Sequence, residues 1–321
     1  MTPDIVIAVP MRNEARSVPR LLRSLGRAAR RVEGRVTVLA LANDCEDGTA
    51  DALRRAAIPF LDVVIEELRL PPDLSSAGYA RRLCMDHAAA LAPEGVMLTT
   101  DADAVVTPGW IAAALTALDN GADLVCGTIA VCRHAIPPSV SNDRIVRAER
   151  AYADLLHEVR YRLDLRAGRQ PPTGRPHYME SGAALALRTR TYHALGGLPH
   201  VSTSEDRALV HRAGEVGLRV TYCPQMRTFV SARMDGRAED GMAACLRTRM
   251  TVADPPADQS MLSVATLADL WAASLSDPTR PFPDRSHPFG ARLRASDLER
   301  MLPELQRFVT EVVHAGIDHA A

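Results

Sequence analysis

The sequence lacks an excess of charge of either sign. Its Lys and Arg residues number 38 and its Asp and Glu residues 39, so the formal net charge is -1. This balance gives no electrostatic reason to expect nucleic acid as a partner. No apolar run is long enough to span a membrane, and no secretory signal is visible. The six cysteines include no CxxC pair, which predicts reduced thiols and a cytoplasmic location. A peripheral association with a membrane stays open.

Several motifs of catalysis and metal binding are also missing. The histidines are isolated, with no His-x-His or His-Glu-x-x-His spacing, and neither a Gly-x-Ser-x-Gly elbow nor a phosphate-binding P-loop occurs. Internal repeats and low-complexity tracts are absent. With 321 residues, of which 47% are hydrophobic and 24% charged, the chain has the composition of a globular enzyme that buries its own core.

The first half of the sequence alternates short apolar runs with amphipathic stretches. Continuous apolar runs predict strands buried on both faces. The alternation predicts an α/β fold with a doubly wound, mostly parallel sheet flanked by helices, in which ligands bind at the carboxyl ends of the strands. The expected strands are residues 5–9, 36–42, 61–65 and 96–100, and the expected helices are residues 15–29, 49–57 and 78–92.

The second half is less regular. Its expected strands are residues 124–131, 183–187 and 220–222, its helices are 145–165 and one that begins near 205, and residues 168–177 form a loop. After about residue 251 the chain becomes Pro-rich and irregular, and it closes with a helix over residues 295–315. We expect a main domain over residues 1–250, with halves 1–130 and 131–250, and an irregular and helical extension over 251–321.

Two carboxylates, Asp101 and Asp103, follow the strand predicted at residues 96–100. Like charges this close repel one another, and a sheet terminus supplies no cation of its own. A divalent cation such as Mg²⁺ or Mn²⁺ resolves the conflict, because hard cations prefer carboxylate and phosphate oxygens. The pair is therefore typical of a site that holds a diphosphate leaving group. The competing interpretation is a solvated surface pair.

Five further polar segments lie before and after this pair in the sequence. They are Pro10 with Arg12-Asn13-Glu14, Asn43-Asp44 with Asp47-Gly48-Thr49, Ala77-Gly78-Tyr79-Ala80-Arg81-Arg82, Glu180-Ser181-Gly182-Ala183, and Ser204-Glu205-Asp206. With Asp101 and Asp103, and in this order, they make the chain resemble the family 2 glycosyltransferases, which adopt the GT-A fold, over roughly residues 4–240.

The resemblance implies a nucleotide-sugar-dependent, hexosyltransferase-like enzyme and a role for each matching residue. Asp103 would be the main metal ligand, Asp101 would lie near the ribose or the metal, and Arg81 would approach the diphosphate. Asp206 would be the general base that takes the proton of the acceptor hydroxyl, with Glu205 beside it. The remaining donor-binding residues would be Pro10, Arg12, Asn13, Glu14, Asn43, Asp44, Ser181 and Gly182.

The sequence departs from the family pattern near residue 230. Many relatives have a metal-binding His there, whereas this chain has Arg233 and Arg237, which would contact the phosphates instead. The third protein ligand of the metal is therefore open. The Gln-x-x-Arg-Trp motif of processive polysaccharide synthases is absent, which disfavours such a synthase.

Three alternatives remain beside an inverting transferase. One is a retaining enzyme that resembles the mannosylglycerate and glucosyl-phosphoglycerate synthases, and another is an inactive protein that binds a nucleotide sugar. The third, a nucleotidyltransferase, is disfavoured because residues 10–14 lack the expected glycines. Aromatic residues make up only 4%, which offers few stacking platforms for a long glycan and favours a small-molecule or lipid-linked acceptor. The nucleotide base, the sugar and the oligomeric state are left open.

Overall fold

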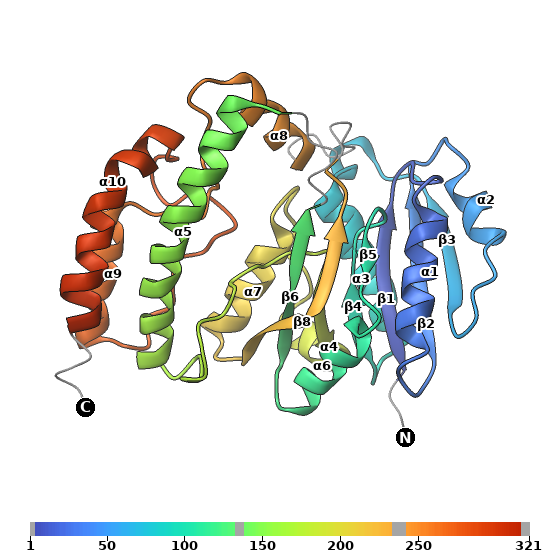
Figure 1. The fold of residues 1–321 in the computed structure, drawn as a ribbon. Helices are drawn as coiled ribbons and strands as arrows, with labels where there is room; N and C mark the ends of the chain where they lie inside the picture. Colours follow the sequence, from blue (N-terminus) through green and yellow to red (C-terminus); the bar gives the residue numbers. More distant parts are fainter. Residues whose placement is uncertain (1–3, 132–137, 233–241, 316–321) are drawn as a thin grey trace. The chain divides into compact units, whose positions relative to one another are not determined.

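The computed structural model describes residues 4–131, 138–232 and 242–315. The chain divides into two compact units (Figure 1). Unit 1 consists of Met1–Ala135 and Met179–Gly241, and unit 2 of Ile136–Tyr178 and Met242–Ala321. Both units are therefore built from segments that are far apart in the sequence. The boundary expected between residues 250 and 251 divides the chain into two consecutive stretches. In the structure, the segment 136–178 instead belongs to the same compact unit as the C-terminal segment.

Unit 1 contains a sheet in the order β3-β2-β1-β4-β7-β6-β8-β5. Strands β1 to β4 pair in parallel, and so do β6 and β8, while β7 and β5 pair antiparallel to their neighbours. This arrangement confirms the predicted doubly wound, mostly parallel sheet. The strands are β1 (Ile5–Met11), β2 (Val36–Asn43), β3 (Asp62–Leu68), β4 (Val96–Thr99), β5 (Val105–Val106), β6 (Leu124–Val131), β7 (Leu185–Arg188) and β8 (Val220–Val230).

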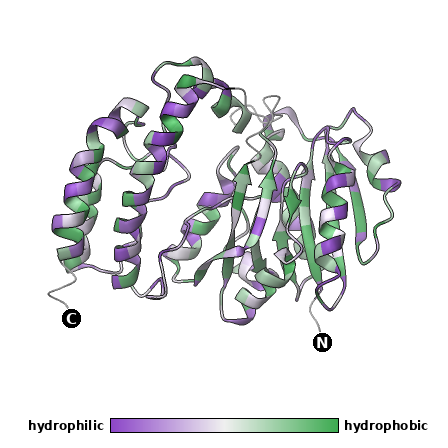
Figure 2. Cartoon of the chain, in the orientation of Figure 1, coloured by the Kyte–Doolittle hydropathy of each residue, from purple (hydrophilic) through white to green (hydrophobic). Residues whose placement is uncertain are grey.

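Apolar side chains cover both faces of this sheet. Alternate residues of β1 point to opposite faces, so that Ile5, Ile7 and Val9 belong to one core while Val6 and Ala8 belong to the other. The strands accordingly appear green over most of their length in Figure 2, whereas the covering helices alternate between green and purple. Burial on both faces explains why the strands read as continuous apolar runs rather than as alternating patterns.

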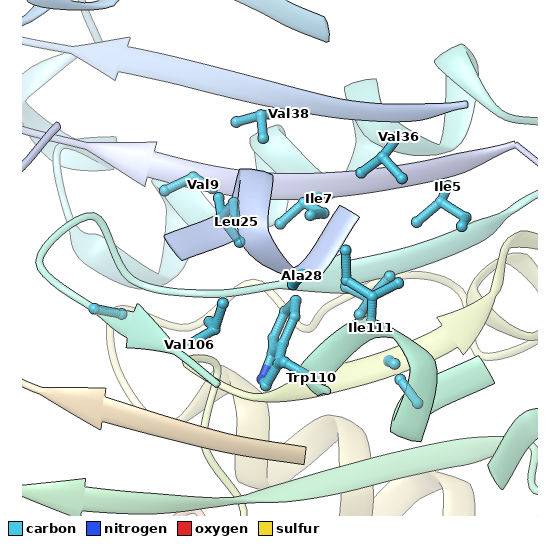
Figure 3. Close-up of a cluster of buried hydrophobic side chains, with 14 of the residues drawn as sticks. Ile5, Ile7, Val9, Leu25, Ala28, Val36, Val38, Val106, Trp110 and Ile111 are labelled. Atoms are coloured by element: carbon cyan, nitrogen blue, oxygen red, sulfur yellow. The ribbon is translucent and has the colours of Figure 1, made fainter. Parts of the chain in front are cut away.

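Different helices cover the two faces. The first core packs β1 and β2 against α1, α2 and α4, with Trp110 and Leu25 at its centre (Figure 3). The second core packs the opposite face against α3, α6 and α7. The helices of unit 1 are α1 (Val18–Ala29), α2 (Thr49–Arg54), α3 (Ala77–Leu91), α4 (Trp110–Asp119), α6 (Thr189–Ala194) and α7 (Glu205–Glu215), with a short 3₁₀ turn η1 (Pro72–Leu74) before α3.

Unit 2 is helical and has a core of its own. It comprises α5 (Val140–Arg166), α8 (Met242–Thr251), α9 (Val264–Ser276), α10 (Ala295–Phe308) and a π-helical turn η3 (Val309–His314) that continues α10. Tyr152 and Leu156 of α5 pack in this core with Trp271 of α9 and Leu298 of α10. None of the helices in the described ranges combines the length and apolar character needed to cross a bilayer.

The chain after residue 251 was predicted to be irregular up to the C-terminal helix. This prediction is wrong for Val264–Ser276, which forms α9. The prolines of this region flank the helix and do not interrupt it. Ser263 caps the helix, because its side chain accepts a hydrogen bond from the Thr266 amide at 3.2 Å. Short helices α4 and α6 were also not predicted, since their apolar residues give no amphipathic pattern long enough to recognise.

Candidate active site

The loops that follow β1 and β2 are joined by hydrogen bonds. Asn13, in the left-handed conformation at φ 55°, accepts a bond from the Glu46 amide on its Oδ1 atom at 2.8 Å. Its own amide donates to Cys45 Sγ at 3.3 Å, and the Glu14 amide donates to Thr49 Oγ1 at 2.8 Å. The two polar segments singled out in the sequence therefore form one continuous surface at the carboxyl edge of the sheet.

Asp44 extends this surface towards the loop before α3. Its carboxylate accepts hydrogen bonds from the Leu70 amide at 3.1 Å, the Ser75 hydroxyl at 3.0 Å and the Asn43 side chain at 3.3 Å. Burial alone acts to raise the pKa of Asp44, but these hydrogen bonds outweigh it and hold the pKa below its ordinary value. Arg12 Nη1 lies 3.5 Å from the Ser75 hydroxyl. Asp44 therefore stays ionised within a fixed set of donors.

Pro10 lies inside β1, opposite Leu41 of β2, rather than in the loop. Glu14 is buried, and its carboxylate accepts a bond from the Ser17 hydroxyl at 2.9 Å just before α1. Its backbone is thus positioned by the loop of β2 and its side chain by the start of α1.

A buried arginine lies at the centre of the acidic segments. Arg81, on α3, donates from Nε to Glu205 Oε1 at 2.9 Å. Its Nη1 atom donates to Thr99 Oγ1 at 2.9 Å and to the Gly182 carbonyl at 3.1 Å. Its Nη2 atom donates to Asp101 Oδ1 at 2.6 Å. One guanidinium therefore connects the end of β4, the loop after it, the turn before β7 and the start of α7.

The charges of this cluster affect one another strongly. Burial by itself lowers the pKa of Arg81, but the carboxylates of Asp101 and Glu205 raise it above its ordinary value, so the guanidinium stays charged. Burial raises the pKa of Glu205 to about 7. The neighbouring charge of Asp206 also raises this pKa, whereas the positive charge of Arg81 lowers it. Glu205 therefore takes up a proton at a higher pH than an exposed glutamate does.

Asp206 differs from Glu205 in its surroundings. It is partly exposed, whereas Glu205 is buried. Its Oδ2 atom accepts from the Gly182 amide at 2.7 Å, and its Oδ1 atom from the Arg207 amide at 2.8 Å. Both acids lie in the first turn of α7, where the helix dipole stabilises negative charge. Asp206 is thus an oriented, accessible carboxylate, and Glu205 is an enclosed one.

Asp101 and Asp103 lie in the loop between β4 and β5. The Asp101 side chain is 35% exposed although one of its oxygens accepts from Arg81, and Asp103 is partly exposed. In the described ranges no three His, Cys, Asp or Glu side chains gather as they do around a fully enclosed metal. Arg81 gives Asp101 a cation from within the fold, which was not expected from the sequence at this position. The partly exposed carboxylates of Asp101 and Asp103 still fit a hard divalent cation that takes its remaining ligands from a phosphate or water.

The other expected residues fall into two groups. Ser181 shapes the turn before β7, because its Oγ atom accepts from the Ala183 amide at 3.3 Å. Arg233 and Arg237 lie outside the described residues. Thr99 was not singled out in the sequence, although it holds Arg81 in place. A threonine at the end of an apolar strand gives no signal of such a role.

The family model for glycosyl transferase family 2 matches residues 6–186, which is more than half of the chain. The chain belongs to glycosyl transferase family 2. The matched range of this glycosyltransferase includes the hydrogen-bonded loops after β1 and β2, Arg81, and the carboxylate pair after β4. It ends before α7. No curated protein sequence matches the chain.

Solved glycosyltransferase structures resemble this family 2 glycosyltransferase in fold. Residues 1–349 of TarS from S. aureus, in complex with UDP-GlcNAc, align with 97% of this chain and 73% of their own at 14% identity, with a TM-score of 0.51. The mannosyltransferase PcManGT from Pyrobaculum calidifontis, in complex with GDP-Man and Mn²⁺, aligns with 98% of this chain and 76% of its own at 16% identity, with a TM-score of 0.52. These similarities establish a GT-A-like fold.

Replacing Gly182 by Ala is expected to disturb the cluster around Arg81. A Cβ atom on Gly182 would overlap the Nε and Cζ atoms of Arg81, so the guanidinium has to move. We expect Gly182→Ala to lower the free energy of unfolding by about 1–3 kcal/mol. Gly214→Ala on α7 is the matched control, because its Cβ meets nothing within 4 Å, and it should raise stability by up to about 1 kcal/mol. Urea unfolding measures both, and equal effects would contradict the close approach.

Replacing Glu205 by Gln is expected to change how stability depends on pH. The unfolded chain releases this proton near the ordinary pKa of 4.5 and the folded protein near 7. Between these values the folded state binds more protons, so the wild type loses stability as the pH rises. Gln does not titrate, and the wild type should therefore lose stability relative to Glu205→Gln when urea unfolding is compared at about pH 5 and pH 8. A constant difference would contradict the raised pKa.

Proposed function

We propose that the protein transfers a sugar from a nucleotide diphosphate donor to a hydroxyl acceptor with inversion at the anomeric carbon. The observation that carries this proposal is the separation of two acidic groups around Arg81. Asp101 and Asp103 lie on one side in the loop after β4, and Glu205 and Asp206 lie on the other at the start of α7. A displacement between a departing diphosphate and an attacking hydroxyl needs both groups.

The donor would bind at the carboxyl edge of the sheet. The loops joined through Asn13 and Thr49 would border the base and ribose, together with Arg12, Asn43 and Asp44. TarS and PcManGT, which bind UDP-GlcNAc and GDP-Man respectively, support a nucleotide sugar as the donor class. Asp103, with Asp101, would hold Mg²⁺ or Mn²⁺, which when bound neutralises charge on the diphosphate.

Asp206 would act as the general base. Its carboxylate is accessible and is oriented by the Gly182 amide, while Glu205 is enclosed and committed to Arg81. A positioned base removes the proton of the acceptor hydroxyl as the oxygen attacks, which contributes about 10²–10⁴-fold to the rate. Asp206 lies in the first turn of α7, where the helix dipole favours a negative charge. The two adjacent acids thus take different roles because their surroundings differ.

Nucleotide binding is the first test of the donor site. We expect one of UDP, GDP, dTDP and CDP to raise the melting temperature in the presence of Mn²⁺ and not in EDTA. A hundredfold excess over the dissociation constant stabilises the folded state by about 2.7 kcal/mol. Asp103→Asn should abolish the shift, whereas Asp119→Asn, a surface control with a 72% exposed side chain, should retain it. The absence of any shift with all four nucleotides would contradict the donor site.

Asp206→Asn tests the base. The amide oxygen of Asn can still accept from the Gly182 amide, whereas its NH2 group cannot accept from the Arg207 amide, so one of the two backbone hydrogen bonds is kept while the basic group is lost. We expect kcat for sugar transfer to fall by about 10²–10⁴-fold with nucleotide affinity unchanged. NMR of the product made by the wild type should show an anomeric configuration inverted relative to the donor. Retention of configuration, or a variant with full activity, would instead favour the retaining alternative.

A further inference from the structure

Arg81 has almost no hydrogen-bonding capacity left for a bound donor. A guanidinium carries five N–H groups. In Arg81 the single N–H of Nε and both N–H groups of Nη1 are directed at protein acceptors, and Nη2 directs one of its two at Asp101. An arginine that binds a phosphate bidentately presents two parallel N–H groups to it. At most one is available here, and the side chain of Arg81 is only 10% exposed.

We infer that Arg81 is a positioning residue, which fixes the carboxylate of Asp101 on the donor side and the base Asp206 on the acceptor side in one arrangement. This inference rests on the proposed function and assigns Arg81 a role different from the diphosphate contact that the family resemblance implies. Arg81 touches Asp101 directly at 2.6 Å and reaches Asp206 through two routes.

The first route runs through Gly182. The carbonyl of Gly182 accepts from Arg81 Nη1, and its amide donates to Asp206 Oδ2 at 2.7 Å. The absence of a side chain lets the guanidinium lie against this residue, because a Cβ atom would overlap it. A shift of Arg81 therefore moves the Gly182 amide, which donates to the Oδ2 atom of the base.

The second route runs through Glu205, the residue before the base. Glu205 is 6% exposed and accepts from Arg81 Nε, so the first turn of α7 is held against the guanidinium. The Gly78 amide of α3 also donates to the Ser202 carbonyl at 3.1 Å, and a Cβ atom on Gly78 would overlap the chain at residues 201 and 202. Helix α3 thus holds the segment that leads into α7 at two points.

The buried charges make this arrangement dependent on Arg81. Removing one partner of a buried ion pair leaves the other charge without compensation, which destabilises a protein more than removing both. Without Arg81, Glu205 would lie buried next to Asp206. The neighbouring Arg82 is engaged elsewhere, because its Nε atom lies 3.6 Å from Asp86 Oδ2 one helical turn along α3. Arg82 is therefore a matched control on the same helix.

Enzyme kinetics separate positioning from donor contact. Turnover of UDP-GlcNAc and of GDP-Man with Mn²⁺ is measured by the release of the nucleoside diphosphate. The binding of UDP and GDP is measured by calorimetry. We expect Arg81→Met to lower kcat by about 100-fold, the effect of a displacement of about 1 Å, and to change the donor KM and the nucleotide Kd by less than about tenfold, because Asp103 remains the main metal ligand. Arg82→Met should behave as wild type.

Arg81→Lys is the conservative variant. It keeps the charge but not the planar fork that reaches four acceptors, so we expect it to recover less than about tenfold of the lost kcat. The opposite pattern, in which Arg81→Met raises the donor KM and the nucleotide Kd more than about tenfold at unchanged kcat, would overturn the inference and assign Arg81 to the donor.

A stability cycle tests the link without relying on turnover. Urea unfolding compares the wild type, Arg81→Met, Glu205→Gln and the double variant. We expect the double variant to unfold at a higher urea concentration than Arg81→Met alone, because the uncompensated carboxylate is gone. Additive effects of the two changes would overturn the link even in an active enzyme. If the wild type binds none of UDP, GDP, dTDP and CDP, the proposed function fails instead, while the cycle still reports on Arg81 and Glu205.

Discussion

The ion pairs of Arg81 are the interaction on which the arrangement of the candidate site depends. The carboxylates of Asp101, Glu205 and Asp206 all raise the pKa of this guanidinium, so it stays charged although it is buried. Such a concentration of negative charge would repel itself without a cation at its centre. Arg81 supplies that cation from within the fold, so the acidic groups stay together before any ligand arrives. The site is in this sense prepared electrostatically by the protein itself.

Glycines permit the close approaches that this arrangement needs. Gly182 allows the guanidinium to lie against the turn before β7, and Gly78 allows the start of α3 to reach the chain before α7. In both places the space for a side chain is taken by atoms of another segment. The position of the charged groups therefore depends on residues that carry no charge and that are recognised only by the space around them.

Much of the architecture could be predicted from the sequence because both faces of the sheet are buried. Strands such as Ile5–Met11 then appear as uninterrupted apolar runs, and the polar residues after them mark the carboxyl edge. Helix α9 was missed because nearby prolines suggested irregular chain, although they lie outside it. The division into two units could not be predicted from the sequence either, because it depends on which apolar helix faces pack against each other.

For the site, the sequence indicated residues but not their partners. Arg81 and Glu205 are separated by 124 positions, and no local pattern shows that they pair. Their contact follows from the packing of α3 and α7 on the same face of the sheet. Thr99 was not anticipated for the same reason, since its role depends on a helix that comes earlier in the chain.

The discontinuous make-up of unit 2 has a consequence for biosynthesis. Helix α5 packs with α9 and α10, yet Val264, the first residue of α9, follows Arg166, the last of α5, by 98 residues. At ribosomal speeds of about 5–20 residues per second, the nascent chain carries α5 without these partners for about 5–20 seconds. During this interval the apolar side chains of Ile145, Tyr152, Leu156 and Val159 are open to chaperones and to other nascent chains. The core of unit 2 can therefore close only after most of the chain has been synthesised.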